Sequence, residues 1–121
     1  MKEIMKPIFH PPLDAITLEG IFHALSDPVR TAIFFEISLS ECAQNCTVFA
    51  RLTERTIPKS TLSQHFKVLR EAGLIRSERQ GVEMNNVSRW SEIEGRFPGL
   101  IPSILEAYKK QLQAKAAEFS L

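Results

Sequence analysis

The sequence predicts a small, mainly α-helical domain that carries one β-hairpin. Two patterns favour this fold class. Apolar residues recur at helical spacing in several segments, and the residues around Gly81 read as two short strands joined by a turn. A length of 121 residues suits one domain with a modest core, so residues 1–121 are expected to form a single domain.

The chain is expected to open with an arm and a short helix. Residues 1–14 are predicted to be a loose N-terminal arm, because the three prolines among them disfavour regular structure. A short amphipathic helix follows, with its apolar positions at Leu18, Ile21, Phe22 and Leu25.

A second helix is predicted to begin at Pro28. Asp27 has the side-chain oxygen of a good N-cap, and proline is favoured at the first helical position, where its missing N–H costs no hydrogen bond. This helix should end near Ser40. Its inward residues are Val29, Ile33, Phe34 and Ile37. Residues 47–52 are expected to form a short third helix, with a turn over residues 51–57.

The sequence predicts a helix at residues 58–73 that has one apolar face and one polar face. One face is an apolar stripe at i, i+4 and i+7, formed by Leu62, Phe66 and Leu69. The opposite face carries short hydrogen-bonding side chains and a cation, which suit base edges and phosphates: Ser60, Gln64 and Lys67. Gly73 is expected to end the helix, because glycine adopts positive φ without a β-carbon penalty.

A β-hairpin is predicted directly after this helix. Residues 74–80 and 82–89 read as strands around Gly81, and Arg76 and Arg79 lie near the turn. The order of these elements is typical of a recognition helix and its wing: a helix, a glycine that ends it, and a hairpin with a basic tip. The sequence therefore favours a winged helix-turn-helix that binds DNA, and the alternative is an ordinary surface helix and hairpin.

Positive charge is concentrated in the same part of the chain. The whole sequence has a net charge of only +1. Residues 51–79 hold seven Lys or Arg against three acidic residues, a net charge of +4, whereas residues 1–50 hold three against six and residues 80–121 balance at five against five. This is the distribution that a phosphate-binding surface requires.

The final helix, residues 99–118, is predicted to serve dimerisation. Its apolar stripe must be buried either on the chain's own core or in a two-fold interface shared with the first helix. A symmetric dimer is favoured because it sets two recognition helices about one DNA turn, roughly 34 Å, apart. The predicted interface residues are Leu18, Ile21, Ile101, Ile104, Leu105, Tyr108 and Leu112.

Two segments resemble the ArsR family of bacterial winged-helix repressors. They are H-A-L-S-D-P-V-R, at residues 23–30, and S-T-L-S-Q-H-F-K-V-L-R-E-A-G-L-I, at residues 60–75, and the resemblance spans residues 18–112. The resemblance implies four helices, two strands and a fifth helix in a homodimer that binds operator DNA and is released by an effector. Pro58 stands where the family has a capping Ser or Thr, so Thr56 or Ser60 would have to supply the cap.

The expected DNA contacts follow from the recognition helix and the wing. Residues expected to face the major groove are Lys59, Ser60, Thr61, Ser63 and Gln64, with His65 on the flank of the helix. Lys67 and Arg79 are expected to contact phosphates or the minor groove, and Arg76 adds to the basic wing.

The predicted effector site is formed by two cysteines. Cys42 and Cys46 are spaced i, i+4, so on one helical face or in a tight loop their sulfurs would converge on As(III), Sb(III) or a divalent soft metal. The family's metal sensors usually carry a closer C-x-C pair, and Thr47 and Phe49 stand at those positions here. Two thiolates are also too few for a closed zinc site. A thiol redox switch and a regulator with two inert cysteines are the alternatives, and no resident cofactor is predicted.

Other classes of protein are disfavoured. The sequence has no glycine-rich phosphate loop, nucleophile elbow or H-E-x-x-H motif, so no enzyme is expected. It has no apolar run of membrane-spanning length and no signal-peptide pattern, so a cytoplasmic protein without membrane association is expected. An alternative from another class is a winged-helix module that binds protein instead of DNA.

Overall fold

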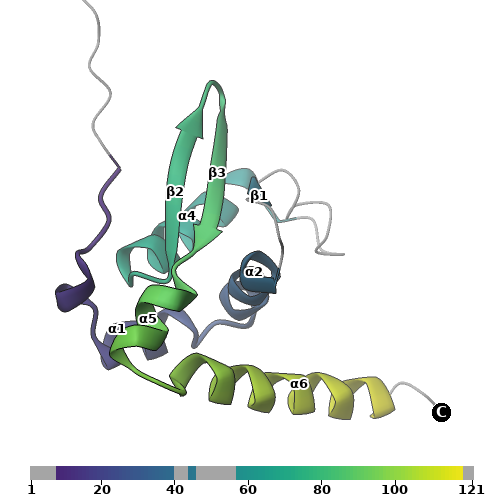
Figure 1. Ribbon diagram of the computed structural model, residues 1–121. Helices are drawn as coiled ribbons and strands as arrows, with labels where there is room; N and C mark the ends of the chain where they lie inside the picture. The colour runs from purple at the N-terminus through teal and green to yellow at the C-terminus, as the bar shows by residue number, and fades with distance from the viewer. Residues whose placement is uncertain (1–7, 40–43, 46–56, 119–121) are drawn as a thin grey trace, which may run out of the picture. The chain divides into compact units, whose positions relative to one another are not determined.

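The computed structural model describes residues 8–39, 44–45 and 57–118 and divides the chain into two compact units. The units are Met1–Arg89 and Trp90–Leu121, where the sequence predicts a single domain. The boundary lies between the hairpin and the helices that follow it (Figure 1).

Three helices of the first unit agree with the sequence prediction in order and position: α1 Leu18–Ala24, α2 Pro28–Leu39 and α4 Lys59–Glu71. A 3₁₀ turn, η1 Leu13–Ala15, precedes them and was not predicted. Asp27 caps α2 as predicted, because its Oδ1 accepts from the N–H groups of Val29 at 2.8 Å and Arg30 at 3.2 Å. Thr17 caps α1 in the same way, accepting from the Gly20 N–H at 3.0 Å. The predicted third helix, residues 47–52, lies outside the described residues.

The wing is part of a three-stranded antiparallel sheet in the order β1-β3-β2. The strands are β1 Gln44–Asn45, β2 Ile75–Gln80 and β3 Glu83–Ser88, and the register of the hairpin runs from Ile75 opposite Ser88 to Gln80 opposite Glu83. The hairpin was predicted from the sequence, whereas β1 was not. A two-residue segment is too short for alternation to reveal a strand, and β1 exists because its backbone pairs with β3.

The hairpin turn depends on glycine. Gln80 pairs with Glu83, so only Gly81 and Val82 form the loop. Gly81 has a φ of +64°, and no non-glycine residue in the described part of the chain has a positive φ. A positive φ at the first loop position alone is the geometry of a type II′ turn, whose twist matches that of the flanking strands.

The core of the first unit is formed by apolar residues from the helices and the base of the hairpin. Phe34 and Phe35 on α2 pack at a ring-centroid distance of 5.2 Å. The other fully or nearly buried apolar residues are Ile16, Ile21, Ala24, Ile33, Ile37, Leu62, Phe66, Leu69, Leu74 and Ile75. Ser38 on α2 donates through its hydroxyl to Ser88 on β3 at 2.8 Å, so a polar contact also ties the helical layer to the sheet.

The second unit contains two helices, α5 Trp90–Arg96 and α6 Leu100–Glu118. The sequence predicts the second of these helices but not the first. Gly99 separates the helices with a φ of +83°, and its N–H donates to the Glu94 carboxylate at 2.8 Å. None of the helices in residues 8–39 and 57–118 is long and apolar enough to cross a membrane.

The exposure of the predicted dimer residues divides them into two groups. Ile21 and Ile101 are fully buried in the single chain, so they are core residues and not interface residues. Their place in the apolar stripes did not distinguish the two roles, because both roles require apolar side chains. The residues that keep exposed or half-exposed surface are Leu18, Ile104, Leu105, Tyr108 and Leu112.

Candidate nucleic-acid interface

Helix α4 presents a polar face to solvent and an apolar face to the core. Leu62, Phe66 and Leu69 are at most 2% exposed, as the i, i+4, i+7 spacing predicts. The predicted groove-facing residues Lys59, Ser60, Thr61, Ser63 and Gln64 are all exposed, and so is Lys67, the predicted phosphate or minor-groove contact. The burial of one stripe therefore fixes which side chains a ligand of this helix would meet.

The start of α4 is suited to a negatively charged partner. Pro58 is the N-cap residue, with no side-chain hydrogen bond, and the first turn contains no acidic residue. The N–H groups of a first turn have no partners within the helix, and the helix dipole places partial positive charge there. Lys59 and Ser60 are exposed beside these groups, so this end of the helix favours phosphate.

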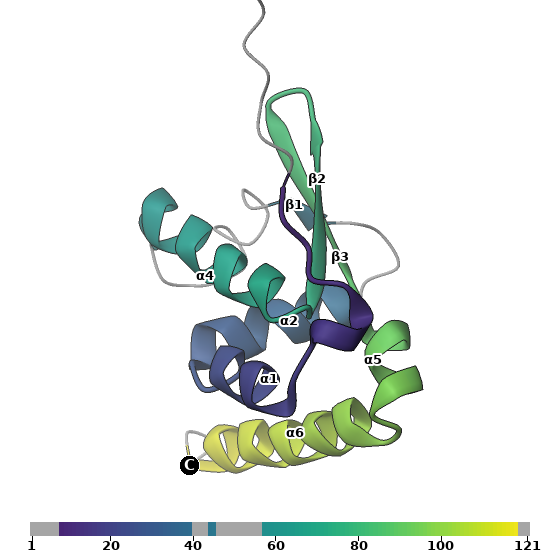
Figure 2. The ribbon, with the colours of Figure 1, turned by 90° about the vertical axis from the view of Figure 1, so that its left-hand side faces the viewer.

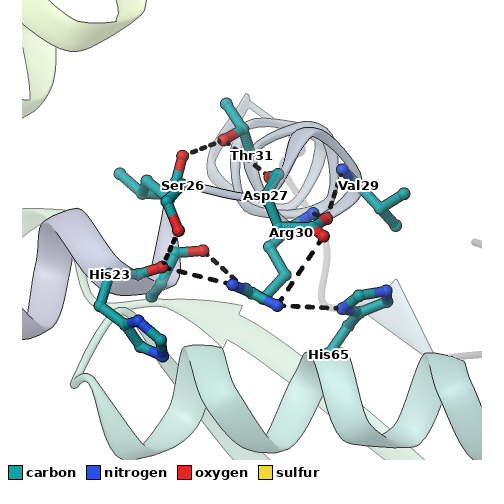
Figure 3. Close-up of polar contacts among 9 residues, drawn as sticks. His23, Ser26, Asp27, Val29, Arg30, Thr31 and His65 are labelled. Atoms are coloured by element: carbon teal, nitrogen blue, oxygen red, sulfur yellow. Dashed lines mark hydrogen bonds and ion pairs between the residues drawn. The ribbon is translucent and has the colours of Figure 1, made fainter.

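Arg30, on α2, contacts both α1 and α4 (Figure 3). Its Nε donates to the Ala24 carbonyl at 2.7 Å and its Nη2 to the His23 carbonyl at 3.3 Å, both at the end of α1. Its Nη1 lies 3.4 Å from Nδ1 of His65 on α4 and 4.0 Å from Oδ2 of Asp27. One guanidinium thus joins α1, α2 and α4 and holds the recognition helix at a defined angle.

His65 therefore has a structural contact in addition to its predicted DNA contact. Its side chain is half-buried, and Nδ1 faces Arg30. Only the Nε2 side of the ring is left to face a ligand of α4.

The end of α4 fixes where the wing begins. Gly73 has a φ of +86°, its N–H donates to the Arg70 carbonyl at 3.0 Å, and the Leu74 N–H donates to the Leu69 carbonyl at 3.0 Å. These two bonds are the pair that defines a Schellman C-cap. Leu74 is completely buried, so the chain leaves the helix through the core and enters β2 directly.

The two predicted wing arginines lie on opposite faces of β2. Side chains alternate along a strand, so Arg79 shares a face with the buried Ile75 and Ser77, and Arg76 does not. Arg79 is exposed, whereas Arg76 is half-buried. Of the two, Arg79 is the more accessible to a ligand.

A buried polar network joins α4 to the hairpin. Ser77 and Asn86, opposite each other on β2 and β3, are 2% and 0% exposed, and the Ser77 hydroxyl donates to the Asn86 side-chain carbonyl at 2.6 Å. Arg70 of α4 donates to the Ser77 oxygen at 3.1 Å. A buried, satisfied network of this kind fixes one arrangement of the elements that it joins.

The N-terminal segment also contacts this junction (Figure 2). The Ser77 backbone N–H donates to Nε2 of His10 at 3.0 Å, and Arg89 donates through Nη1 to the carbonyl of the buried Pro11 at 2.8 Å. His10 and Pro11 thus bind β2 and the residue that follows β3, where the sequence predicts a loose arm. Burial lowers the pKa of His10, the charges of Arg76, Arg70 and Arg89 lower it further, and Glu78 has the opposite effect.

Sequence reasoning did not identify these stabilising residues. His10 and Ser77 are 67 positions apart, and Pro11 and Arg89 are 78 apart. Polar contacts over such separations leave no periodic pattern. Arg30 differs from these residues, because it lies one helical turn after Asp27, the residue that caps α2.

The predicted effector cysteines lie outside the described residues. Gln44 and Asn45, between Cys42 and Cys46, form strand β1, so a continuous helix does not join the cysteines. Within residues 8–39, 44–45 and 57–118, His, Asp and Glu side chains do not gather in a group of three that could hold a metal ion.

Known proteins are similar to this chain in sequence and in fold. A family model described as a helix-turn-helix domain matches residues 25–78. Two curated relatives, each an HTH-type transcriptional repressor SmtB, come from Mycobacterium tuberculosis strains CDC 1551 / Oshkosh and ATCC 25618 / H37Rv. Each is 35% identical to this chain over 75 residues. That match covers 61% of this chain, which spans about half (53%) of each relative's length.

Two solved structures show the same fold at lower sequence identity. An ArsR-like transcriptional regulator from Rhodococcus sp. RHA1 is 22% identical with a TM-score of 0.55, and the match covers 85% of this chain and 92% of that one. A crystal structure of an ArsR family transcriptional regulator has the same identity and TM-score, with 83% and 96% covered. The chain is thus similar in sequence to SmtB repressors, contains a match to a helix-turn-helix domain and has the winged-helix fold of ArsR-like regulators.

Proposed function

We propose that this protein is a homodimeric repressor of the ArsR type that inserts α4 into the major groove of operator DNA. The observation that carries the proposal is the exposed polar face of α4, whose opposite stripe is buried in the core. The family is one of DNA-binding transcriptional regulators and not of enzymes. The curated relatives are repressors by name, which supports repression as the outcome of binding.

The proposed contacts divide into those that read sequence and those that bind backbone. Gln64, in the middle of the exposed face, would hydrogen-bond a base edge, because a carboxamide offers both a donor and an acceptor. Lys67 and Arg79 would bind phosphates, which are the same at every sequence. Lys59 and the polar residues of the first turn would approach the groove beside the positive end of the helix dipole.

Fluorescence anisotropy on the DNA upstream of the protein's own gene, and on random DNA, tests these roles. Gln64→Ala should lower the preference for the specific site by about 1–3 kcal/mol, and Lys67→Ala should weaken both DNAs alike and reduce the salt dependence. Lys110→Ala, on α6, is the matched control for loss of one exposed lysine. Equal losses on both DNAs for Gln64→Ala and Lys67→Ala would contradict the assigned roles. Affinity for both DNAs that hardly changes with salt would favour a protein-binding module instead.

The proposed dimer would use the exposed apolar surface of α1 and α6. Leu18 is 38% exposed and Leu112 is 45% exposed, and apolar surface of this kind is stabilised when a partner covers it. Leu112→Asp should shift the protein toward monomer in sedimentation equilibrium and reduce affinity for a two-half-site operator. Lys115→Asp, on the same helix, is the control. A monomeric parent protein would overturn the dimer.

The proposed effector acts through Cys42 and Cys46. Thiolates suit As(III), Sb(III) or a divalent soft metal, and the same pair would respond to an oxidant by forming a disulfide. Anisotropy with As(III), Zn²⁺, Cd²⁺ or oxidant, in the parent protein and in Cys42→Ser and Cys46→Ser, separates these cases. A response in the parent alone supports a cysteine sensor, and less than a few-fold change with every additive indicates an effector-independent regulator.

A further inference from the structure

Residues 10–16 form a strap across the junction between α4 and the wing. At one end His10 accepts from the Ser77 N–H of β2 at 3.0 Å. At the other end the side chain of Ile16 covers Gly73 so closely that a β-carbon there would lie 2.4 Å from Ile16 Cδ1. Between them, the Pro11 carbonyl accepts from Arg89 at 2.8 Å. The strap therefore contacts the end of the recognition helix, the first wing strand and the residue after the second.

The contact at His10 depends on the protonation state of the imidazole. Nε2 accepts a hydrogen bond from a backbone N–H, so this nitrogen must carry no proton and the ring must be neutral, with its proton on Nδ1. Protonation would place an N–H donor against the Ser77 N–H donor. Ser77 cannot move away at low cost, because its hydroxyl is held in the buried pair with Asn86 and by Arg70.

The charges around His10 also oppose its protonation. Arg70 from α4, Arg76 from β2 and Arg89 from the end of β3 all lower the pKa of the ring, and Glu78 from β2 is the acidic group that raises it. A proton on His10 would thus add a fourth cation to this junction, and the ring would leave Ser77.

We propose that His10 is a positioning residue for DNA binding: its neutral ring fixes the strap, and thereby the angle between α4 and the wing, and its protonation releases both. The inference rests on the proposed DNA-binding function. If His10 has this role, the affinity of the protein for its operator should fall as the pH is lowered. Added positive charge on an exposed histidine would have the opposite effect, because it would strengthen binding to the DNA phosphates.

Three variants isolate the ring's role in the full-length protein. His10→Gln keeps an acceptor for the Ser77 N–H and does not titrate, and His10→Ala removes the acceptor at every pH. His23→Gln, on the exposed face of α1, is the control for loss of one histidine. His65, on α4, is present in both the parent and His10→Gln, so the ratio of the two affinities removes its contribution.

The contact itself is read in the protein without DNA. In ¹⁵N-correlated NMR spectra from pH 8 to pH 5.5, the Ser77 amide should shift with the titration of His10 in the parent and in His23→Gln. It should stay constant in His10→Gln. A Ser77 amide that does not respond to His10 would overturn the inference, whatever the DNA results are.

Binding to operator DNA by anisotropy over the same pH range then tests the coupling. We expect the affinity of the parent, relative to His10→Gln, to fall as the pH is lowered from 8 to 5.5, because the ring and the DNA-binding surface are coupled. His10→Ala should be weakened already at pH 8. A ratio that stays constant with pH overturns the inference while the proposed function stands. Failure of every variant and of the parent to bind DNA at pH 8 overturns the proposed function, and the inference with it.

Discussion

Gly73→Ala should destabilise this protein more than a typical substitution at an exposed glycine. The residue has a φ of +86°, and an L-residue in the left-handed region costs about 1–2 kcal/mol. The new β-carbon would also lie 2.4 and 2.5 Å from two atoms of the buried Ile16, and overpacking of this kind costs about 1–3 kcal/mol. The expected loss is therefore about 2–5 kcal/mol, against a total of about 5–15 kcal/mol for an ordinary domain.

Gly81→Ala separates the two contributions. Its φ of +64° imposes the same kind of backbone penalty, but a β-carbon there would meet no atom within 4 Å. Urea denaturation of both variants, followed by circular dichroism, measures the two losses of unfolding free energy at a common m-value. Gly73→Ala should lose at least about 1 kcal/mol more than Gly81→Ala, because only the first variant disturbs packing.

A double-mutant cycle identifies the atoms responsible. Ile16→Ala removes the side chain that the new β-carbon would meet, so the double variant should be more stable than the sum of the two single losses predicts. Equal losses for Gly73→Ala and Gly81→Ala, together with additivity in the cycle, would refute the close contact of the strap with the end of α4.

Three further outcomes follow from the contacts of the first unit. Pro58→Ser should be more stable than Pro58→Ala by about 1 kcal/mol in thermal denaturation, because a hydroxyl supplies the N-cap acceptor that proline lacks; equal stability would show that α4 is already capped. Arg30→Met should lose about 2 kcal/mol in urea denaturation and weaken binding to all DNAs alike, through the loss of hydrogen bonds to a charged group. In contrast, Arg79→Met should weaken DNA binding and change the free energy of unfolding by no more than about 0.5 kcal/mol. A large loss of stability in Arg79→Met and none in Arg30→Met would contradict the assignment of Arg30 to structure and Arg79 to DNA contact. The pKa of His10 is lowered in the folded protein from its ordinary value of 6.5, so the unfolded chain binds the proton first as the pH falls. The stability that His10 contributes above pH 6.5 should therefore be lost as the pH falls through the folded-state pKa. His10→Gln should lack this loss in denaturation from pH 8 to pH 5, and identical pH profiles would contradict it.

Local features of the fold were predictable because their causes lie within a few residues. Asp27 and Pro28 define a helix start by capping chemistry alone, and Gly73 defines a helix end by its conformational freedom. The stripe of Leu62, Phe66 and Leu69 repeats with the period of the helix, so its burial could be predicted without knowledge of what covers it.

The predictions were weaker wherever one pattern serves two structures. An apolar residue on an amphipathic helix is suited equally to a core and to a dimer interface, so Ile21 and Ile101 were predicted as interface residues although the single chain buries them completely. Prolines disfavour helices but do not prevent packing, and so the predicted loose arm includes residues that contact the wing through His10 and Pro11.

The sequence by itself determined the order of the helices and the hairpin, the polar face of α4 and the basic segment around it, because these depend on periodicity, caps and local charge. Only the tertiary structure decided how that face is held. The contacts of Arg30 with α1 and α4, the buried pair of Ser77 and Asn86, and the bond from Ser77 to His10 join residues that are distant in the chain. Such contacts depend on how the elements pack against one another, and no local pattern of residues records them.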